Sequence, residues 1–80
     1  MEEKVRRVKE AAIKELEKAQ REAGISTLEL ARRAGLGQAT VYFWKSGRAF
    51  PRLETLVMVA DALGKDVEIC FVDKPEEGEA

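Results

Sequence analysis

The sequence predicts a small all-α domain, and three observations carry that prediction. A chain of 80 residues has room for one domain with a small core. Apolar residues recur at steps of three and four along most of the chain, as on one face of an α-helix. Glycine, which readily takes the left-handed conformation that ends a helix, follows four of these stretches, at Gly24, Gly35, Gly47 and Gly64. We therefore expect four helices before residue 65.

The composition excludes several classes of protein. The chain has one cysteine, Cys70, and no histidine, so it has neither an internal disulfide nor a Cys/His zinc set. The sequence also lacks a Ser/His pair and a phosphate-cradling glycine loop, so we expect no enzyme and no cofactor. The first residues are charged, and no apolar run is long enough for a signal peptide or a membrane span. We expect a cytoplasmic protein.

Charge is distributed unevenly along the chain. The formal net charge is −1, but residues 26–52 carry about +4 and residues 53–80 about −6. Binding to a polyanion depends on the local field and not on the charge of the whole chain. The basic middle segment is thus compatible with nucleic-acid binding, and a merely solvated, unevenly charged surface remains the alternative.

The first predicted helix covers residues 3–23. Pairs such as Glu10 and Lys14 have the i,i+4 spacing of ion pairs on the solvent-exposed faces of this helix. A helix of this length is long for so small a domain, and we expect its first two turns to project or to contact a second subunit. Its apolar stripe comprises Val5, Val8, Ala12, Leu16, Ala19 and Ala23, with Ile13 alongside.

Three shorter helices follow. Ser26 and Glu29 have the spacing of a capping box, which begins a helix over residues 27–34. A third helix covers residues 38–46, with Gly37 as a weak cap and with Val41 and Trp44 turned toward the core. The fourth is expected at about 52–63, directly after a proline-containing connector.

The period of the sequence changes after Gly64. Residues 66–72 are rich in β-branched and aromatic side chains, which predicts a strand. One strand needs a partner for its backbone groups, so we expect pairing with a second copy across a two-fold axis. An irregular packed tail is the alternative. The domain is expected to span residues 1–74, and the acidic tail 75–80 to be disordered. The strand residues are Val67, Ile69, Cys70, Phe71 and Val72.

Residues 27–46 carry the functional motif. Two short helices are joined by a tight turn with Gly35, an apolar residue follows at Leu36, and small Ala31 lies within the first helix. Two helices that cross steeply need a small residue where their backbones approach, a glycine to turn and an apolar plug to fix the angle. A helix-turn-helix of this kind places its second helix in the major groove of DNA.

The run GISTLELARRAGLGQATVYFWKSGRAFPRLETLVMVADALG, residues 24–64, resembles the Cro/repressor-type helix-turn-helix family (the XRE, or lambda-repressor-like, family). The resemblance implies a lambda-repressor-like four-helix DNA-binding domain. The segment after residue 64 is similar to HipB-like antitoxins, which implies a strand that pairs between two subunits and a toxin protein as partner. The positions that carry the family resemblance are Leu30, Ala31, Gly35, Leu36, Thr40, Val41, Trp44, Gly47, Pro51, Leu53, Thr55, Leu56, Ala60, Leu63 and Gly64.

The resemblance also implies a function and a set of site residues. The function is sequence-specific binding of double-stranded DNA by a homodimeric transcriptional repressor on a pseudo-palindromic operator. The implied base-reading residues are Gln38, Ala39, Tyr42 and Phe43. The implied phosphate contacts are Thr27, Thr40, Lys45, Arg48 and Arg52.

Tyr42 and Phe43 stand where the family usually has polar residues, and three interpretations stay open. They contact thymine methyl groups or sugars, they are partly buried beneath the connector near Phe50, or they form a surface that binds protein. In the last case the chain is a protein-interaction module on a helix-turn-helix scaffold that no longer reads DNA.

Overall fold

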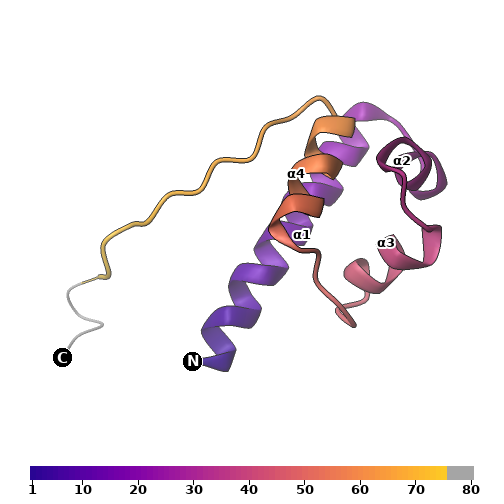
Figure 1. Ribbon diagram of the computed structural model, residues 1–80. Coiled ribbons are helices and arrows are strands. Elements are labelled where there is room, and N and C mark those ends of the chain that lie inside the picture. Colours follow the sequence, from indigo (N-terminus) through magenta and orange to yellow (C-terminus); the bar gives the residue numbers. More distant parts are fainter. Residues whose placement is uncertain (76–80) are drawn as a thin grey trace.

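The computed structural model describes residues 1–75, which form four helices and no strand. The helices are α1 (Glu2–Ala23), α2 (Thr27–Ala34), α3 (Gln38–Lys45) and α4 (Leu53–Ala62), arranged as Figure 1 shows. Helix α2 packs against both α3 and α4. Residues of α1 and α4 together line one groove, and α1 also contributes Ile13 and Leu16 to the core. This arrangement confirms the predicted all-α class.

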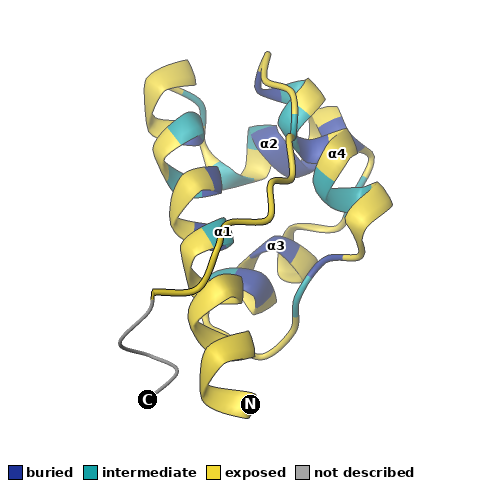
Figure 2. Ribbon diagram, turned by 90° about the vertical axis from the view of Figure 1, so that its left-hand side faces the viewer, coloured by how far each residue is buried: buried dark blue, intermediate teal, exposed yellow. Residues whose placement is uncertain are grey.

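The core lies where the helices face one another (Figure 2). Its centre is formed by Leu30, Val41 and Val59, one from each of the three shorter helices, and none of them is exposed to solvent. Ile13 and Leu16 of α1 complete it. Burying an aliphatic side chain of this size stabilises the fold by about 1.5–3 kcal/mol, so these few residues supply much of the driving force for folding.

The buried stripe of α1 is shorter than predicted and is rotated around the helix. Its buried residues are Ile13, Leu16 and Gln20, whereas Val5 and Val8 of the predicted stripe are exposed. A helix of 22 residues is about 33 Å long, and the three shorter helices cover only its C-terminal half. Residues 1–11 are therefore all exposed, and the N-terminal turns project from the domain (Figures 1 and 2).

The other helices begin and end within one residue of the predicted bounds. Helix α2 has the bounds expected for it, and α3 ends at Lys45 instead of at residue 46. Helix α4 is one residue shorter at each end than predicted. The residues lost are caps, whose backbone is only partly helical. Among residues 1–75, no helix is both long enough and apolar enough to span a membrane.

The strand predicted at residues 66–72 does not form in the single chain. The segment leaves α4 as an extended trace without regular secondary structure (Figure 1). Only Val67 is half-buried, while Ile69, Phe71 and Val72 are exposed. A strand needs the backbone of a second extended segment, and residues 1–75 offer none. Apart from Pro75, the predicted acidic tail lies outside the described residues.

Candidate nucleic-acid interface

The turn between α2 and α3 has the features expected of a helix-turn-helix. Gly35 has a φ of 71°, a left-handed conformation that a side chain disfavours. The N–H of Leu36 donates to the carbonyl of Ala31 at 2.8 Å, and the Leu36 side chain packs against the core. Ala31 itself is buried, where α2 meets its neighbours. The turn thus fixes the angle between α2 and α3.

Helix α3 divides into a buried face and an exposed face. Val41 and Trp44 lie in the core, as predicted. The opposite face, which includes every residue predicted to read bases, is exposed. Tyr42 keeps 51% of its surface exposed and Phe43 44%, so neither side chain is removed from solvent. The exposed residues of this face are Gln38, Ala39, Thr40, Tyr42 and Phe43.

No side chain caps the N-terminus of α3. The cap residue is Gly37, whose extended backbone brings no hydroxyl or carboxylate to the first turn. The unpaired N–H groups at the start of a helix bind anions, because the helix dipole adds to their positive charge. The first turn of α3 therefore offers donors beside the exposed side chain of Gln38.

The connector after α3 folds back onto the end of that helix. The N–H groups of Arg48 and Ala49 both donate to the carbonyl of Phe43, at 2.9 and 3.3 Å. The Arg48 guanidinium lies 5.9 Å from the centroid of the Phe43 ring, within the range of a cation–π contact. This pairing holds a cation at the edge of the exposed α3 face. Arg52, at the start of α4, is also exposed.

Lys45 and Thr27 contact each other within a polar cluster that joins three helices. The Lys45 ammonium donates to the Gln20 side-chain oxygen at 2.8 Å and to the Thr27 hydroxyl oxygen at 3.0 Å. The Gln20 amide nitrogen donates to the carbonyl of Ile25 at 3.1 Å and to the Thr27 hydroxyl oxygen at 3.3 Å. Two residues expected to contact phosphate are therefore engaged in bonds that link α1, α2 and α3.

The sequence reasoning did not identify Gln20 as a member of this site. The spacing of Gln20 could have identified it, because Gln20 lies four residues after Leu16 and therefore on the buried face of α1. A polar residue at such a position usually has a hydrogen-bonding partner within the protein.

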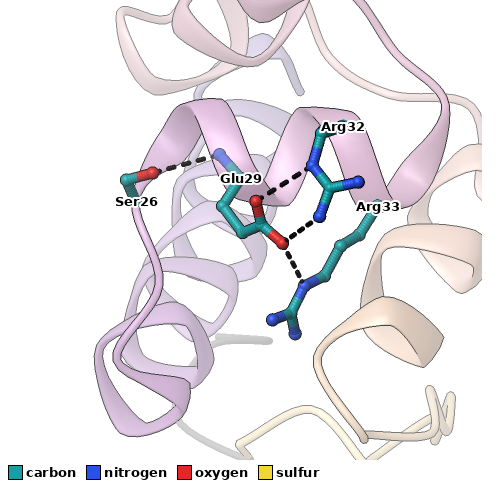
Figure 3. Close-up of polar contacts among 4 residues, drawn as sticks. All are labelled: Ser26, Glu29, Arg32 and Arg33. Atoms are coloured by element: carbon teal, nitrogen blue, oxygen red, sulfur yellow. Dashed lines mark hydrogen bonds and ion pairs between the residues drawn. The ribbon is translucent and has the colours of Figure 1, made fainter.

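The start of α2 forms only half of the predicted capping box (Figure 3). The Ser26 hydroxyl accepts the N–H of Glu29 at 3.0 Å, as expected. The Glu29 carboxylate does not return the bond. It accepts Arg32 Nε at 3.0 Å, Arg32 Nη2 at 2.6 Å and Arg33 Nε at 2.7 Å. Hydrogen bonds between charged groups are stronger than a bond to a neutral N–H. The carboxylate therefore binds the two arginines instead of the backbone N–H of Ser26.

The bonds of Glu29 with Arg32 and Arg33, here called the clamp, change the electrostatics of the basic segment. Hydrogen bonds from Arg32 and then from Arg33 lower the pKa of Glu29 to about 2, and the pKa of Arg32 rises for the same reason. Glu29 is thus fully ionised at neutral pH and offsets part of the charge of the two arginines. Arg48 and Arg52 are not neutralised in this way, because neither has an ion-pair partner among residues 1–75.

Comparison with known protein families gives a match that covers this interface. Residues 13–69 match the model of a family described as helix-turn-helix. Comparisons with curated proteins and with solved structures give no match. The matched region holds the whole of α2, α3 and α4, the buried part of α1 and the connector with Arg48. With the turn, the buried α3 face and more than half of the chain in agreement, the protein belongs to the helix-turn-helix family of DNA-binding transcriptional regulators.

Proposed function

We propose that the protein is a homodimeric repressor that binds a pseudo-palindromic DNA operator with α3 in the major groove. The observation that carries this proposal is the division of α3. Val41 and Trp44 anchor the helix in the core, and the opposite face presents Gln38, Ala39 and Phe43 to solvent. A helix held in this way can enter a groove without loss of core contacts.

Each exposed residue has a proposed role at the DNA. Gln38 has the paired donor and acceptor that match the major-groove edge of adenine, and Ala39 fits the methyl group of thymine. Tyr42 and Phe43 contact thymine methyl groups or sugars one turn further on. These four side chains form the proposed base-reading surface.

Phosphate contacts are proposed on both sides of that surface. Arg48 and Arg52 are exposed cations near the ends of the connector, and Thr40 lies in the first turn of α3. Thr27 and Lys45 act as a joined pair at the N-terminus of α2, where the helix dipole adds positive potential. Such contacts fix the position of the protein on the duplex without reading its sequence.

The dimer is proposed to form through residues 66–72. Ile69, Phe71 and Val72 expose 67%, 96% and 83% of their surfaces in the single chain. Pairing with the same segment of a second copy satisfies the backbone and removes these apolar groups from water. Two recognition helices related by a two-fold axis fit half-sites about one helical turn, or about 34 Å, apart.

A toxin protein is proposed as a second partner, on the ground of the resemblance to HipB-like antitoxins. It binds a face away from α3, so that DNA and toxin are held together. Co-purification of the full chain with the product of any gene next to its own tests this partner. If the two proteins do not form a complex, the toxin is removed from the proposal.

The exposure of two aromatic side chains favours one alternative function. Tyr42 and Phe43 lie on the solvent face of α3, and exposed aromatic groups are common in surfaces that bind proteins. In this alternative α3 binds a protein and does not read DNA. Salt dependence separates the two functions, because DNA binding releases counterions and an apolar protein interface does not.

The experiment that tests the proposal is selection from a random duplex DNA pool, carried out at two salt concentrations. A palindromic consensus whose affinity falls steeply with salt supports a dimeric repressor. Absence of enrichment at low salt overturns DNA reading and leaves the protein-binding alternative.

A further inference from the structure

A second groove lies between α1 and the connector that follows α3. Its volume is about 420 Å³. Apolar groups from three parts of the chain line it, namely Ile13 of α1, Trp44 of α3 and Phe50 of the connector. Its charged lining is mainly basic, with Arg6, Lys9, Lys14, Lys45 and Arg48 against Glu10 and Glu17.

The positive charge of this groove is largely not neutralised. Arg6 is paired with Glu3 at 2.6 Å. Lys9, Lys14 and Arg48, by contrast, have no carboxylate within ion-pair distance among residues 1–75. The pair that the sequence spacing predicts between Glu10 and Lys14 does not form.

Lys9 is held in place by an aromatic ring. Its ammonium lies 5.6 Å from the centroid of the Phe50 ring, in the geometry of a cation–π contact. Phe50 in turn packs against the core. This contact links the projecting part of α1 to the connector and keeps a cation above an apolar floor.

The groove is continuous with the proposed DNA interface. Lys45 and Arg48 belong to both, and Arg48 also contacts Phe43 on the base-reading surface. From these residues the groove extends along α1 as far as Lys9 and Arg6, in its exposed N-terminal turns. A polyanion that reaches Arg48 from α3 thus has a basic path onward.

We propose that this groove binds the sugar-phosphate backbone of the duplex next to the base pairs that α3 reads. Lys9 and Lys14 contact phosphates, and the apolar floor receives deoxyribose. The inference rests on the proposed function, because it extends the DNA contact from α3 to α1. It predicts that α1 adds affinity and salt dependence without adding sequence preference.

The test compares two double variants of the full chain that carry the same change in charge. Lys9→Gln with Lys14→Gln removes two cations from the groove. Lys4→Gln with Lys18→Gln is the control, because it removes two exposed cations of α1 that do not line this groove. Lys18 lines the other groove, between α1 and α4. Affinity for the selected operator is measured by fluorescence anisotropy over a series of salt concentrations.

We expect the groove variant to lower the slope of log K against log salt concentration by about 2, because each phosphate contact contributes about 0.9. At about 0.1 M salt this corresponds to a loss of roughly 60-fold in affinity. The selected consensus stays the same. The control variant keeps the wild-type slope, and Lys9→Arg with Lys14→Arg keeps it as well.

Two results overturn the inference while leaving the proposed function intact. One is a groove variant with the wild-type slope, and the other is a control variant that loses as much slope as the groove variant. Failure of the wild-type protein to bind any duplex overturns the proposed function and the inference together. Thermal unfolding of all variants verifies that the exposed substitutions leave the fold unchanged.

Discussion

The ammonium of Lys45 lies 2.8 Å from the side-chain oxygen of Gln20, which joins the last residue of α3 to the C-terminal part of α1. Gln20 is buried, and its amide nitrogen also donates to the carbonyl of Ile25. No buried side-chain polar atom lacks a partner within residues 1–75. The bond therefore belongs to a satisfied network, and breaking it leaves charged or polar groups without partners.

The first prediction concerns this network. Gln20→Leu is expected to destabilise the protein by about 1–3 kcal/mol, because the Ile25 carbonyl loses its partner and Lys45 keeps only the Thr27 hydroxyl as an acceptor. Combining it with Lys45→Met removes the ammonium and is expected to cost less than the sum of the single changes. Chemical denaturation followed by circular dichroism measures these values. A Gln20→Leu variant as stable as the wild type would contradict the assigned role.

The second prediction compares two glycines at the turn. Gly35→Ala is expected to cost about 1–2 kcal/mol, because a φ of 71° is strained for any residue with a side chain. Gly37, by contrast, has an ordinary φ of −72°. A serine there has space for its side chain, since the nearest atom to its Cβ is Thr40 Oγ1 at 3.9 Å. It adds a cap to α3 and is expected to stabilise by a few tenths of a kcal/mol. Equal effects at the two positions, measured by thermal unfolding, would refute this account of the turn.

The third prediction is a pH dependence at the start of α2. The folded pKa of Glu29 is about 2, below its ordinary value of 4.5. A lowered pKa stabilises the folded state above about pH 4.5, and that contribution disappears as the pH falls toward 2. The wild type is thus expected to have a higher Tm than the Glu29→Gln variant at pH 6, and this difference in Tm is expected to disappear by pH 2. A difference in Tm that is constant across this range would argue against the clamp.

The fourth prediction tests the dimer. Deletion of residues 66–80 is expected to give a monomer and to weaken operator binding, because the exposed Ile69 and Phe71 no longer bring two subunits together. Deletion of 76–80 alone removes no large apolar residue and is expected to leave the dimer intact. Light scattering gives both masses. A dimer that persists without residues 66–80 would place the subunit contact elsewhere.

The fifth prediction concerns base reading. Gln38→Ala is expected to cost about 1–3 kcal/mol on the selected operator and to relax specificity at one base position. Affinity for a scrambled duplex should not change, because phosphate contacts are kept. An equal loss on both duplexes would mean that Gln38 does not read a base.

The elements were predictable from the sequence because their signals are local. Periodic apolar residues and the glycines that follow them place α2, α3 and α4 to within one residue. The contacts between helices were not predictable in the same way. The burial of Gln20, the ring of Phe50 beneath Lys9 and the turn of Glu29 toward two arginines depend on packing or on competition between partners.

For two segments the outcome depends on a neighbour, which no local signal in the sequence specifies. The apolar stripe of α1 includes Val5 and Val8, but only a neighbour can bury a stripe, and none covers these two side chains, which lie in the turns expected to project. The strand at 66–72 has the right composition but no partner within the described chain. Both segments remain exposed and apolar where a second molecule has room to bind.

The carboxylate of Glu29 has a consequence for how the protein finds its target. A regulator must sample a great excess of unrelated DNA, and its time on each stretch grows with the charge it presents to the backbone. By holding Arg32 and Arg33, Glu29 lowers that charge within the recognition unit itself. We therefore expect each non-specific encounter to be shorter than it would be without Glu29. Under the proposed function, the ion pairs of Glu29 with Arg32 and Arg33 are thus expected to favour a fast search and to leave residence at the operator to the side chains of α3.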